Sequence, residues 1–182
     1  RLCGKIGGGA NGYGDYANAN MSQWFNACSS GGKYNYPYGN AYDGQKCNGK
    51  DKGRGATMPV ATCPDCISTE SGYTGVYDLS GNVFEWEDSC NGTSGSSDPC
   101  RLRGGSFNNN NDNLRCANDN NNDRNNSNDN IGLRCCGPLG PQELAGPKPG
   151  LRSRSPARHG APACLRELQT IAPGSVAVGQ RP

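Results

Sequence analysis

The segment GVYDLSGNVFEW, residues 75–86, carries the strongest strand signal in the chain. Bulky aliphatic and aromatic side chains stand on both sides of Ser80-Gly81-Asn82, a sequence that is typical of a turn. The segment therefore predicts two short strands joined at residues 80–82. Two further short strands are predicted at residues 101–107 (RLRGGSF) and 131–135 (IGLRC).

The last two predicted strands enclose residues 108–130, which we call the asparagine tract. Thirteen of its 23 residues are Asn and four are Asp. These side chains compete with the backbone for hydrogen bonds, so composition alone indicates a disordered or low-complexity loop. The other interpretation of such a long insertion is a binding loop. Leu114, Cys116 and Arg124 interrupt the run, and we expect them to act as packing and clamp points.

The composition of the 182-residue chain limits its hydrophobic core. Only 32% of the residues are hydrophobic, and there are 28 Gly and 11 Cys. Such a chain relies on turns, hydrogen-bonded loops and cross-links rather than on long helices. One short amphipathic helix is predicted at residues 21–28. Residues 29–55 are expected to form turns across which aromatic side chains pack.

A change of composition at Gly137 predicts two parts. Residues 1–136 carry a net charge of −2 and form the predicted folded domain, whereas residues 137–182 are rich in Pro, Arg and Ala and carry +4. We expect residues 137–182 to be a disordered tail, produced by read-through or a frame shift; a functional basic tail is the alternative. The near-neutral domain gives no reason to expect a nucleic-acid partner.

The scarcity of histidine excludes several classes of enzyme. The only histidine is His159, in the predicted tail. Residues 1–136 therefore hold no histidine general base, no Ser-His-Asp or Cys-His pair and no H-E-x-x-H zinc site. The sequence also has no apolar run of about 18 residues and no recognisable signal peptide, so we expect no transmembrane segment.

Eleven cysteines in a small, Gly-rich chain indicate disulfides and an oxidising compartment. Cys90 and Cys100 flank the loop NGTSGSSDP, and we expect one disulfide to close it. Cys116 is expected to pair with Cys135 or Cys136 and so to clamp the asparagine tract.

The motif Cys63-Pro-Asp-Cys66 permits three interpretations. We favour two structural half-cystines in a loop. The alternatives are a redox dithiol and half of a zinc site completed by Cys47. A second C-x-x-C motif and a βαβ context are both missing from the sequence, which is why the structural interpretation is preferred.

Three acidic residues lie at the end of the opening segment or directly after it. Glu85, Glu87 and Asp88 could serve as paired carboxylates in acid–base catalysis or as oxygen ligands of Ca²⁺. We expect Glu87 and Asp88 to be solvated surface charges. Glu85 lies between Phe84 and Trp86, and we expect it to be buried, either hydrogen-bonded or facing a metal ion.

Three motifs in fixed order carry a resemblance to a known family. Residues 75–86, 102–107 (LRGGSF) and 131–135 resemble the signature segments of the formylglycine-generating-enzyme-like, or sulfatase-modifying factor, domain. Upstream, residues 24–28 (WFNAC) and 36–39 (YPYG) are similar to that family's equivalent segments, so the resemblance spans about residues 20–136. It implies an α+β domain of C-type-lectin-like fold, with small antiparallel sheets, few short helices, long loops and, as an optional structural ion, Ca²⁺.

The resemblance does not extend to the family's catalytic cysteines. Its enzymes oxidise a cysteine of sulfatase substrates with O₂ and copper, using two cysteines shortly after the G-G-S motif. By spacing, the first would fall near Asn109 and the second about five residues later, but no cysteine precedes Cys116 there. Without a thiolate pair there is no soft copper site, so we expect no catalysis and no required cofactor. A copper oxidase acting on sulfatase cysteine is the rival hypothesis.

The asparagine tract is similar to the variable region of proteins encoded by diversity-generating retroelements, here residues 103–135. In those systems template adenines are randomised during copying, and Asn codons begin with two adenines. The resemblance implies that the asparagines of the tract form a diversified ligand-binding surface while the flanking motifs stay fixed. The residues implied are Asn108, Asn109, Asn110, Asn111, Asn113, Asn118, Asn120, Asn121, Asn122, Asn125, Asn126 and Asn128.

The hypothesis is thus a non-catalytic receptor-binding or display protein. It predicts an extracellular, cell-surface or phage-particle location and a protein or glycan ligand on another cell or a phage host. Because amides form hydrogen bonds but offer few aromatic anchors, this template-like version should bind weakly. A structural or adhesive surface domain without diversification is the second rival.

Overall fold

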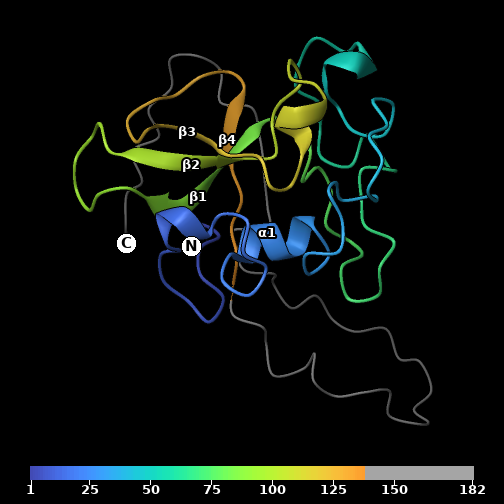
Figure 1. The fold of residues 1–182 in the computed structure, drawn as a ribbon. Coiled ribbons are helices and arrows are strands. Elements are labelled where there is room, and N and C mark those ends of the chain that lie inside the picture. Colours follow the sequence, from blue (N-terminus) through green and yellow to red (C-terminus); the bar gives the residue numbers. More distant parts are fainter. Residues whose placement is uncertain (138–182) are drawn as a thin grey trace, which may run out of the picture.

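The computed structural model describes residues 1–137, so the predicted tail lies outside the described residues except for Gly137. Four strands form one sheet in the order β3-β2-β1-β4, and one short helix, α1, lies against it (Figure 1). Long loops make up most of the rest. The elements are η1 (Tyr13–Asp15), α1 (Gln23–Cys28), η2 (Lys50–Lys52), β1 (Phe84–Cys90), β2 (Pro99–Arg103), η3 (Asn111–Leu114), β3 (Asn120–Asp123) and β4 (Ile131–Leu133).

The sheet is mixed rather than purely antiparallel. β1 and β2 form an antiparallel hairpin, and β3 adds to the free edge of β2, also antiparallel. β4 pairs with β1 in parallel, with Glu85 opposite Gly132. The parallel pair arises because the chain leaves β3 at one edge of the sheet and crosses to the opposite edge before β4 begins (Figure 1).

The opening segment contains one strand instead of the two predicted. Before the turn, only Tyr77 makes a β-bridge, to Ile67. Asp78 and Asn82 adopt positive φ angles of 57° and 65°, which break an extended conformation. Residues 78–82 therefore form a buried loop, and the strand begins at Phe84 and continues beyond Trp86 to Cys90.

The predicted helix is present as α1, and its sequence explains both its start and its packing. The Ser22 hydroxyl accepts a hydrogen bond from the Phe25 backbone N–H at 2.9 Å, which caps the first turn. Trp24, Phe25 and Cys28 are buried on the side that faces the sheet. They form a core cluster with Leu79 and with two further cysteines, Cys3 and Cys116.

Four disulfides join pairs of cysteines that both lie in the described part of the chain, and they compensate for this small core. They join Cys3 to Cys136, Cys28 to Cys116, Cys47 to Cys66 and Cys90 to Cys100. The loop-closing Cys90–Cys100 bond is as expected. The expectation that Cys116 pairs with Cys135 or Cys136 is wrong, because Cys116 follows η3 and lies against α1, where Cys28 is its neighbour. Cys136 instead meets the N-terminal segment, which pairs with the residues after β4 through a bridge between Leu2 and Cys135.

The Cys63-Pro-Asp-Cys66 motif is only partly cross-linked. Cys66 is a structural half-cystine, as expected, but its partner is Cys47. The expectation that Cys63 is also a half-cystine is wrong, because Cys63 is buried beside this disulfide and keeps a free thiol whose pKa is raised by burial. A zinc site made from these three residues would need the thiolates of Cys47 and Cys66, and both are consumed in the disulfide.

Candidate functional site

The asparagine tract is built on regular elements, which its composition did not predict. Asn111–Leu114 form the 3₁₀ helix η3, and Asn120–Asp123 form β3. β3 pairs with β2 residue by residue, from Leu102 opposite Asn120 to Pro99 opposite Asp123. The free edge of β2 offers unpaired backbone donors and acceptors, and pairing with them outweighs the poor strand propensity of Asn.

Three expected anchor residues fasten the tract to the rest of the domain. Leu114 is 2% exposed, and its backbone carbonyl accepts a hydrogen bond from the Ser80 hydroxyl. Cys116 is cross-linked to α1. Arg124 makes an ion pair with Asp98 at 3.4 Å, in the loop between β1 and β2. These three anchor contacts, together with the β3 pairing, involve none of the tract's asparagine side chains.

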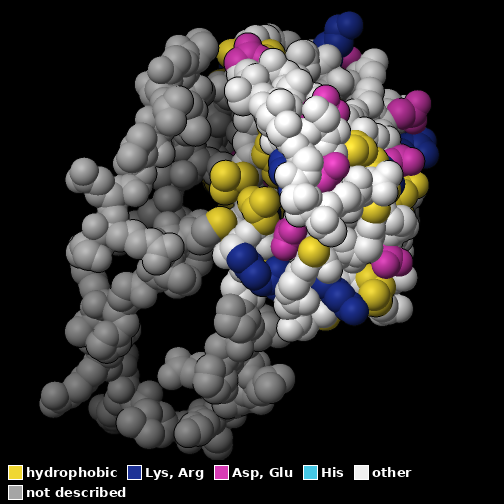
Figure 2. Space-filling model, turned by 90° about the vertical axis from the view of Figure 1, so that its left-hand side faces the viewer, with side chains coloured by type: hydrophobic (Ala, Val, Ile, Leu, Met, Phe, Trp, Pro, Cys, Tyr) yellow, Lys and Arg dark blue, Asp and Glu magenta, His cyan; other side chains and the backbone are white. Residues whose placement is uncertain are grey.

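None of the twelve implied ligand-binding asparagines is buried. The face turned toward the viewer in Figure 2 is mostly white, the colour of uncharged polar side chains and of the backbone, with scattered hydrophobic, acidic and basic side chains. The six exposed residues are Asn108, Asn110, Asn111, Asn121, Asn125 and Asn128. The six half-buried residues are Asn109, Asn113, Asn118, Asn120, Asn122 and Asn126. Side chains at these twelve positions can reach solvent.

Some asparagine side chains of the tract also form local hydrogen bonds within the domain. The side-chain oxygen of Asn109 accepts hydrogen bonds from the backbone N–H and the hydroxyl of Ser106, at 3.0 and 2.6 Å. The start and end of the tract approach each other here, since the Asn130 amide lies 3.5 Å from the Asn108 side-chain oxygen. The first and last loops of the tract thus share one surface region.

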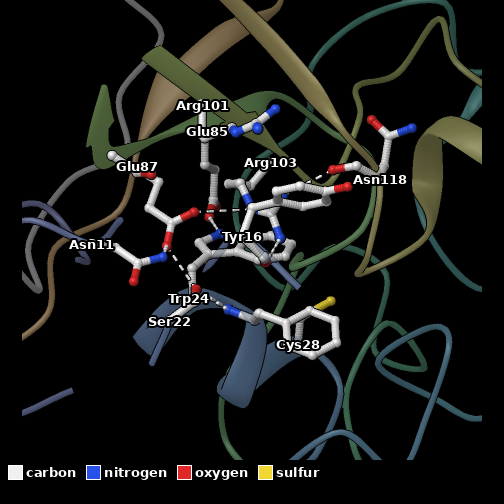
Figure 3. A network of polar contacts seen from close by, with 12 residues as sticks. Asn11, Tyr16, Ser22, Trp24, Cys28, Glu85, Glu87, Arg101, Arg103 and Asn118 are labelled. Carbon is white, nitrogen blue, oxygen red and sulfur yellow. Dashed lines mark hydrogen bonds and ion pairs between the residues drawn. The ribbon is translucent and has the colours of Figure 1, made fainter. Parts of the chain in front are cut away.

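Beneath the tract, the inner face of the sheet carries a buried network of charges, shown in Figure 3. The expectation that Glu87 is a solvated surface charge is wrong, because its side chain is fully buried. It accepts hydrogen bonds from Ser22 at 2.6 Å and Asn11 at 3.2 Å, and it pairs with Arg103 at 3.2 Å. Burial raises the pKa of Glu87, and burial lowers the pKa of Arg103 to about 10. Asp88 is half-buried.

Arg103 connects this network to the middle of the tract. Its guanidinium donates hydrogen bonds to the backbone carbonyls of Cys116 at 2.9 Å and Asn118 at 2.8 Å. It also lies 4.8 Å from the centre of the Trp24 ring. Sequence reasoning missed Arg101 and Arg103 as structural residues. The sequence signal for them was the alternation of charged residues, since Arg-x-Arg on one strand can place both arginines opposite the two glutamates of Glu-x-Glu on the neighbouring strand.

Glu85 was expected to be buried and either hydrogen-bonded or facing a metal ion, and the structure shows it buried and hydrogen-bonded. It is 2% exposed. Its oxygens accept hydrogen bonds from the Trp24 indole at 2.8 Å and from the Arg134 guanidinium at 2.7 and 2.8 Å. Both oxygens therefore accept hydrogen bonds, and Arg134 supplies a counter-charge to the carboxylate. Within residues 1–137 there is no group of three or more His, Cys, Asp or Glu residues that could hold a metal ion.

The two positions assigned by spacing to the oxidase cysteines hold no thiol. Asn109 is half-buried and bonded to Ser106, and Leu114 is in the core. The sulfatase-modifying factor enzyme 1-like domain matches residues 10–138. The chain belongs to this domain family. The resemblance seen in the sequence motifs is thereby confirmed.

The sulfatase-modifying factor enzyme 1-like domain of this chain therefore has the α+β fold that its motifs imply, with one small sheet, few short helices and long loops. No curated protein matches the sequence. None of the helices within residues 1–137 has the length and apolar character needed to cross a membrane.

Proposed function

We propose that this chain is a non-catalytic ligand-binding protein whose binding surface is the asparagine tract. One observation carries the proposal: the tract is fastened by its backbone and by Leu114, Cys116 and Arg124, while all twelve implied asparagines reach solvent. A surface built this way can change its side chains without changing its fold. That property is required of a diversified binding site, and a low-complexity loop has no need of it.

Sequencing sibling copies of the gene tests the proposal. Diversification from an adenine-rich template predicts substitutions at Asn codons such as those of Asn108, Asn121 and Asn125. It predicts none at Gly104 and Gly105, which adopt φ angles of 82° and 70° and lie close to backbone and core atoms. If the asparagine codons vary no more than the two glycine codons, the tract is fixed, and a structural or adhesive domain becomes the better account.

The oxidase hypothesis has a separate test. Copper oxidation of a sulfatase cysteine would need two thiolates near Phe107, whereas Asn109 and Leu114 stand at the positions assigned by spacing. We expect no tight Cu(I) binding and no turnover of a sulfatase-derived cysteine peptide. As a matched control, the Asn109→Cys/Leu114→Cys variant places thiols at these positions. Turnover by the unmodified chain would overturn the proposal.

The proposal also covers the ligand and the location. Solvent-facing amides suit the hydrogen-bonding groups of a protein or glycan on another cell or a phage host. The four disulfides are typical of oxidising compartments, which supports an extracellular, cell-surface or phage-particle location. The proposed activity requires no cofactor.

A further inference from the structure

A second surface feature lies outside the asparagine tract. Residues 38–44 and Lys46 line an open pocket of about 590 Å³. Tyr36, which is 2% exposed, contacts two of the lining residues. The Tyr36 ring stacks on Tyr38 with a centroid separation of 5.5 Å and an interplanar angle of 9°, and it meets Tyr42 at 5.6 Å and 48°. Three aromatic rings thus form one cluster.

Hydrogen bonds hold the rings of Tyr38 and Tyr42 in place. The Tyr42 hydroxyl donates to the Asp51 carboxylate at 2.9 Å. The Tyr38 hydroxyl donates to the Asp43 carbonyl at 3.3 Å and accepts from the Asp43 N–H at 3.2 Å. Burial raises the pKa of Tyr42 to about 12, so its hydroxyl stays protonated in neutral solution. A ligand would therefore meet pre-positioned rings and would lose little entropy in ordering them.

The pocket adjoins the asparagine tract. The Tyr36 hydroxyl donates a hydrogen bond to the side-chain oxygen of Asn111, in η3. The Asn35 carbonyl accepts a hydrogen bond from the Cys116 N–H at 2.8 Å. The aromatic cluster is therefore continuous with the proposed binding surface, but it lies in a segment with no asparagine-dense run.

The polar groups at the pocket rim indicate the class of ligand. Asn40 and Asp43 are exposed, and the Lys46 ammonium lies 5.2 Å from the centre of the Tyr38 ring. These groups donate and accept hydrogen bonds close to a half-buried aromatic ring. A pyranose ring matches this arrangement, because it combines apolar C–H faces with hydroxyl groups around its edge. An apolar peptide side chain would find only Ala41 as an aliphatic neighbour.

We propose that the Tyr38–Tyr42 pocket binds a pyranose ring and serves as a constant subsite beside the variable surface. The inference rests on the proposed function, because it makes a glycan the ligand of that same site. The Tyr42 ring packs against one face of the sugar, while Asn40, Asp43 and Lys46 bond its hydroxyls. The asparagine tract then contacts the units that extend beyond this ring.

Methyl glycosides of glucose, galactose, mannose and N-acetylglucosamine are the probes for the test. The full chain, labelled at its tyrosine rings, is titrated with each glycoside and followed by NMR. We expect saturable shifts of the Tyr38 and Tyr42 ring signals for at least one glycoside, with a dissociation constant in the millimolar range (about 1–20 mM). N-acetylphenylalaninamide serves as the peptide-like competitor.

Variants separate a site from a structural effect. Tyr42→Ala should weaken binding at least about tenfold. Ala41→Leu should also weaken it, by filling the pocket while leaving every tyrosine contact intact. Tyr73→Ala, which removes a half-buried tyrosine outside the pocket, should have no effect. Unchanged binding in Ala41→Leu, absence of shifts with all four glycosides, or stronger shifts with N-acetylphenylalaninamide would overturn the inference.

The same titration distinguishes failure of this inference from failure of the proposed function. Glycoside binding in a protein whose sibling genes show no variation at Asn codons would support the pocket and reject the variable surface. Variable sibling genes without glycoside binding would reject the pocket alone.

Discussion

The inner face of the sheet and the asparagine tract lie on adjacent strands yet treat polar side chains in opposite ways. On the inner face, Glu85, Glu87 and Arg103 are buried, and each is paired. On the tract, amides are exposed, and most of the fastening is done by the backbone and a few anchors. The buried charged side chains thus specify the fold, whereas the exposed amide side chains of the tract mainly contact solvent.

The contrast has an energetic basis. A buried charge is tolerated only when its partners satisfy it, and removal of one partner leaves an uncompensated charge. An exposed amide exchanges protein contacts for water at little cost. Substitutions on the inner face should therefore be costly, and substitutions on the tract should be nearly neutral.

Arg103→Met should have the largest effect. It leaves Glu87 buried without its ion pair and frees the carbonyls of Cys116 and Asn118, so we expect a loss of about 3–5 kcal/mol in the free energy of unfolding. Urea denaturation measures this loss. Arg124→Met, which removes a partly exposed ion pair, should cost less than about 1 kcal/mol. Equal losses in the two variants would remove the contrast between the regions.

Loss of the disulfide between the core and the tract should rank next. Cys28→Ala/Cys116→Ala opens a bond between residues 88 positions apart, which corresponds to about 4–5 kcal/mol of chain entropy and typically to 2–5 kcal/mol in practice. Cys90→Ala/Cys100→Ala opens a separation of only 10 positions, or about 2.5–3 kcal/mol. The Cys28→Ala/Cys116→Ala variant should therefore unfold at a lower temperature than the Cys90→Ala/Cys100→Ala variant. The reverse order would show that Cys116 does not fasten the tract.

The pH dependence of stability sharpens the contrast further. The pKa of Glu87 is raised above its usual value of 4.5 by burial, so the folded state binds this proton more tightly than the unfolded state. The contribution of this group is fully present below pH 4.5 and is lost as pH rises through the folded pKa, by about 1.4 kcal/mol for each unit of elevation. The measurement is urea unfolding of the wild type and Glu87→Gln between pH 4 and 7. The wild-type stability minus the variant stability should fall with rising pH; a rise would contradict a raised pKa.

Single asparagines of the tract should show the smallest effects. Asn109→Ala removes the acceptor of two Ser106 hydrogen bonds and should cost about 1 kcal/mol. Asn121→Ala and Asn125→Ala change exposed side chains and should stay within about 0.5 kcal/mol of the wild type. Thermal unfolding of the three variants tests the ranking. A loss above about 2 kcal/mol for Asn121→Ala would mean that the tract side chains specify the fold.

Local patterns in the sequence were sufficient for part of this result. The order of the 75–86, 102–107 and 131–135 motifs predicted the family, and the apolar spacing of residues 21–28 predicted α1. The loop NGTSGSSDP predicted the Cys90–Cys100 disulfide. Leu114 and Cys116 pointed to an ordered tract, because pure low-complexity segments carry few such anchors. Each of these inferences depends on residues close together in the chain.

Only the tertiary structure decided which polar residues are buried. Glu87, followed by Asp88, has the local sequence of a surface residue, and its burial depends on Asn11, Ser22 and Arg103, which come from distant segments. The same holds for β3, whose asparagines form a strand because β2 presents an open edge. Local sequence determined the turns, the helix and the chemistry of the exposed surface. Long-range pairing determined burial, disulfide connectivity and the order of the tract, because the free energy of a buried polar group depends on partners that local composition does not reveal.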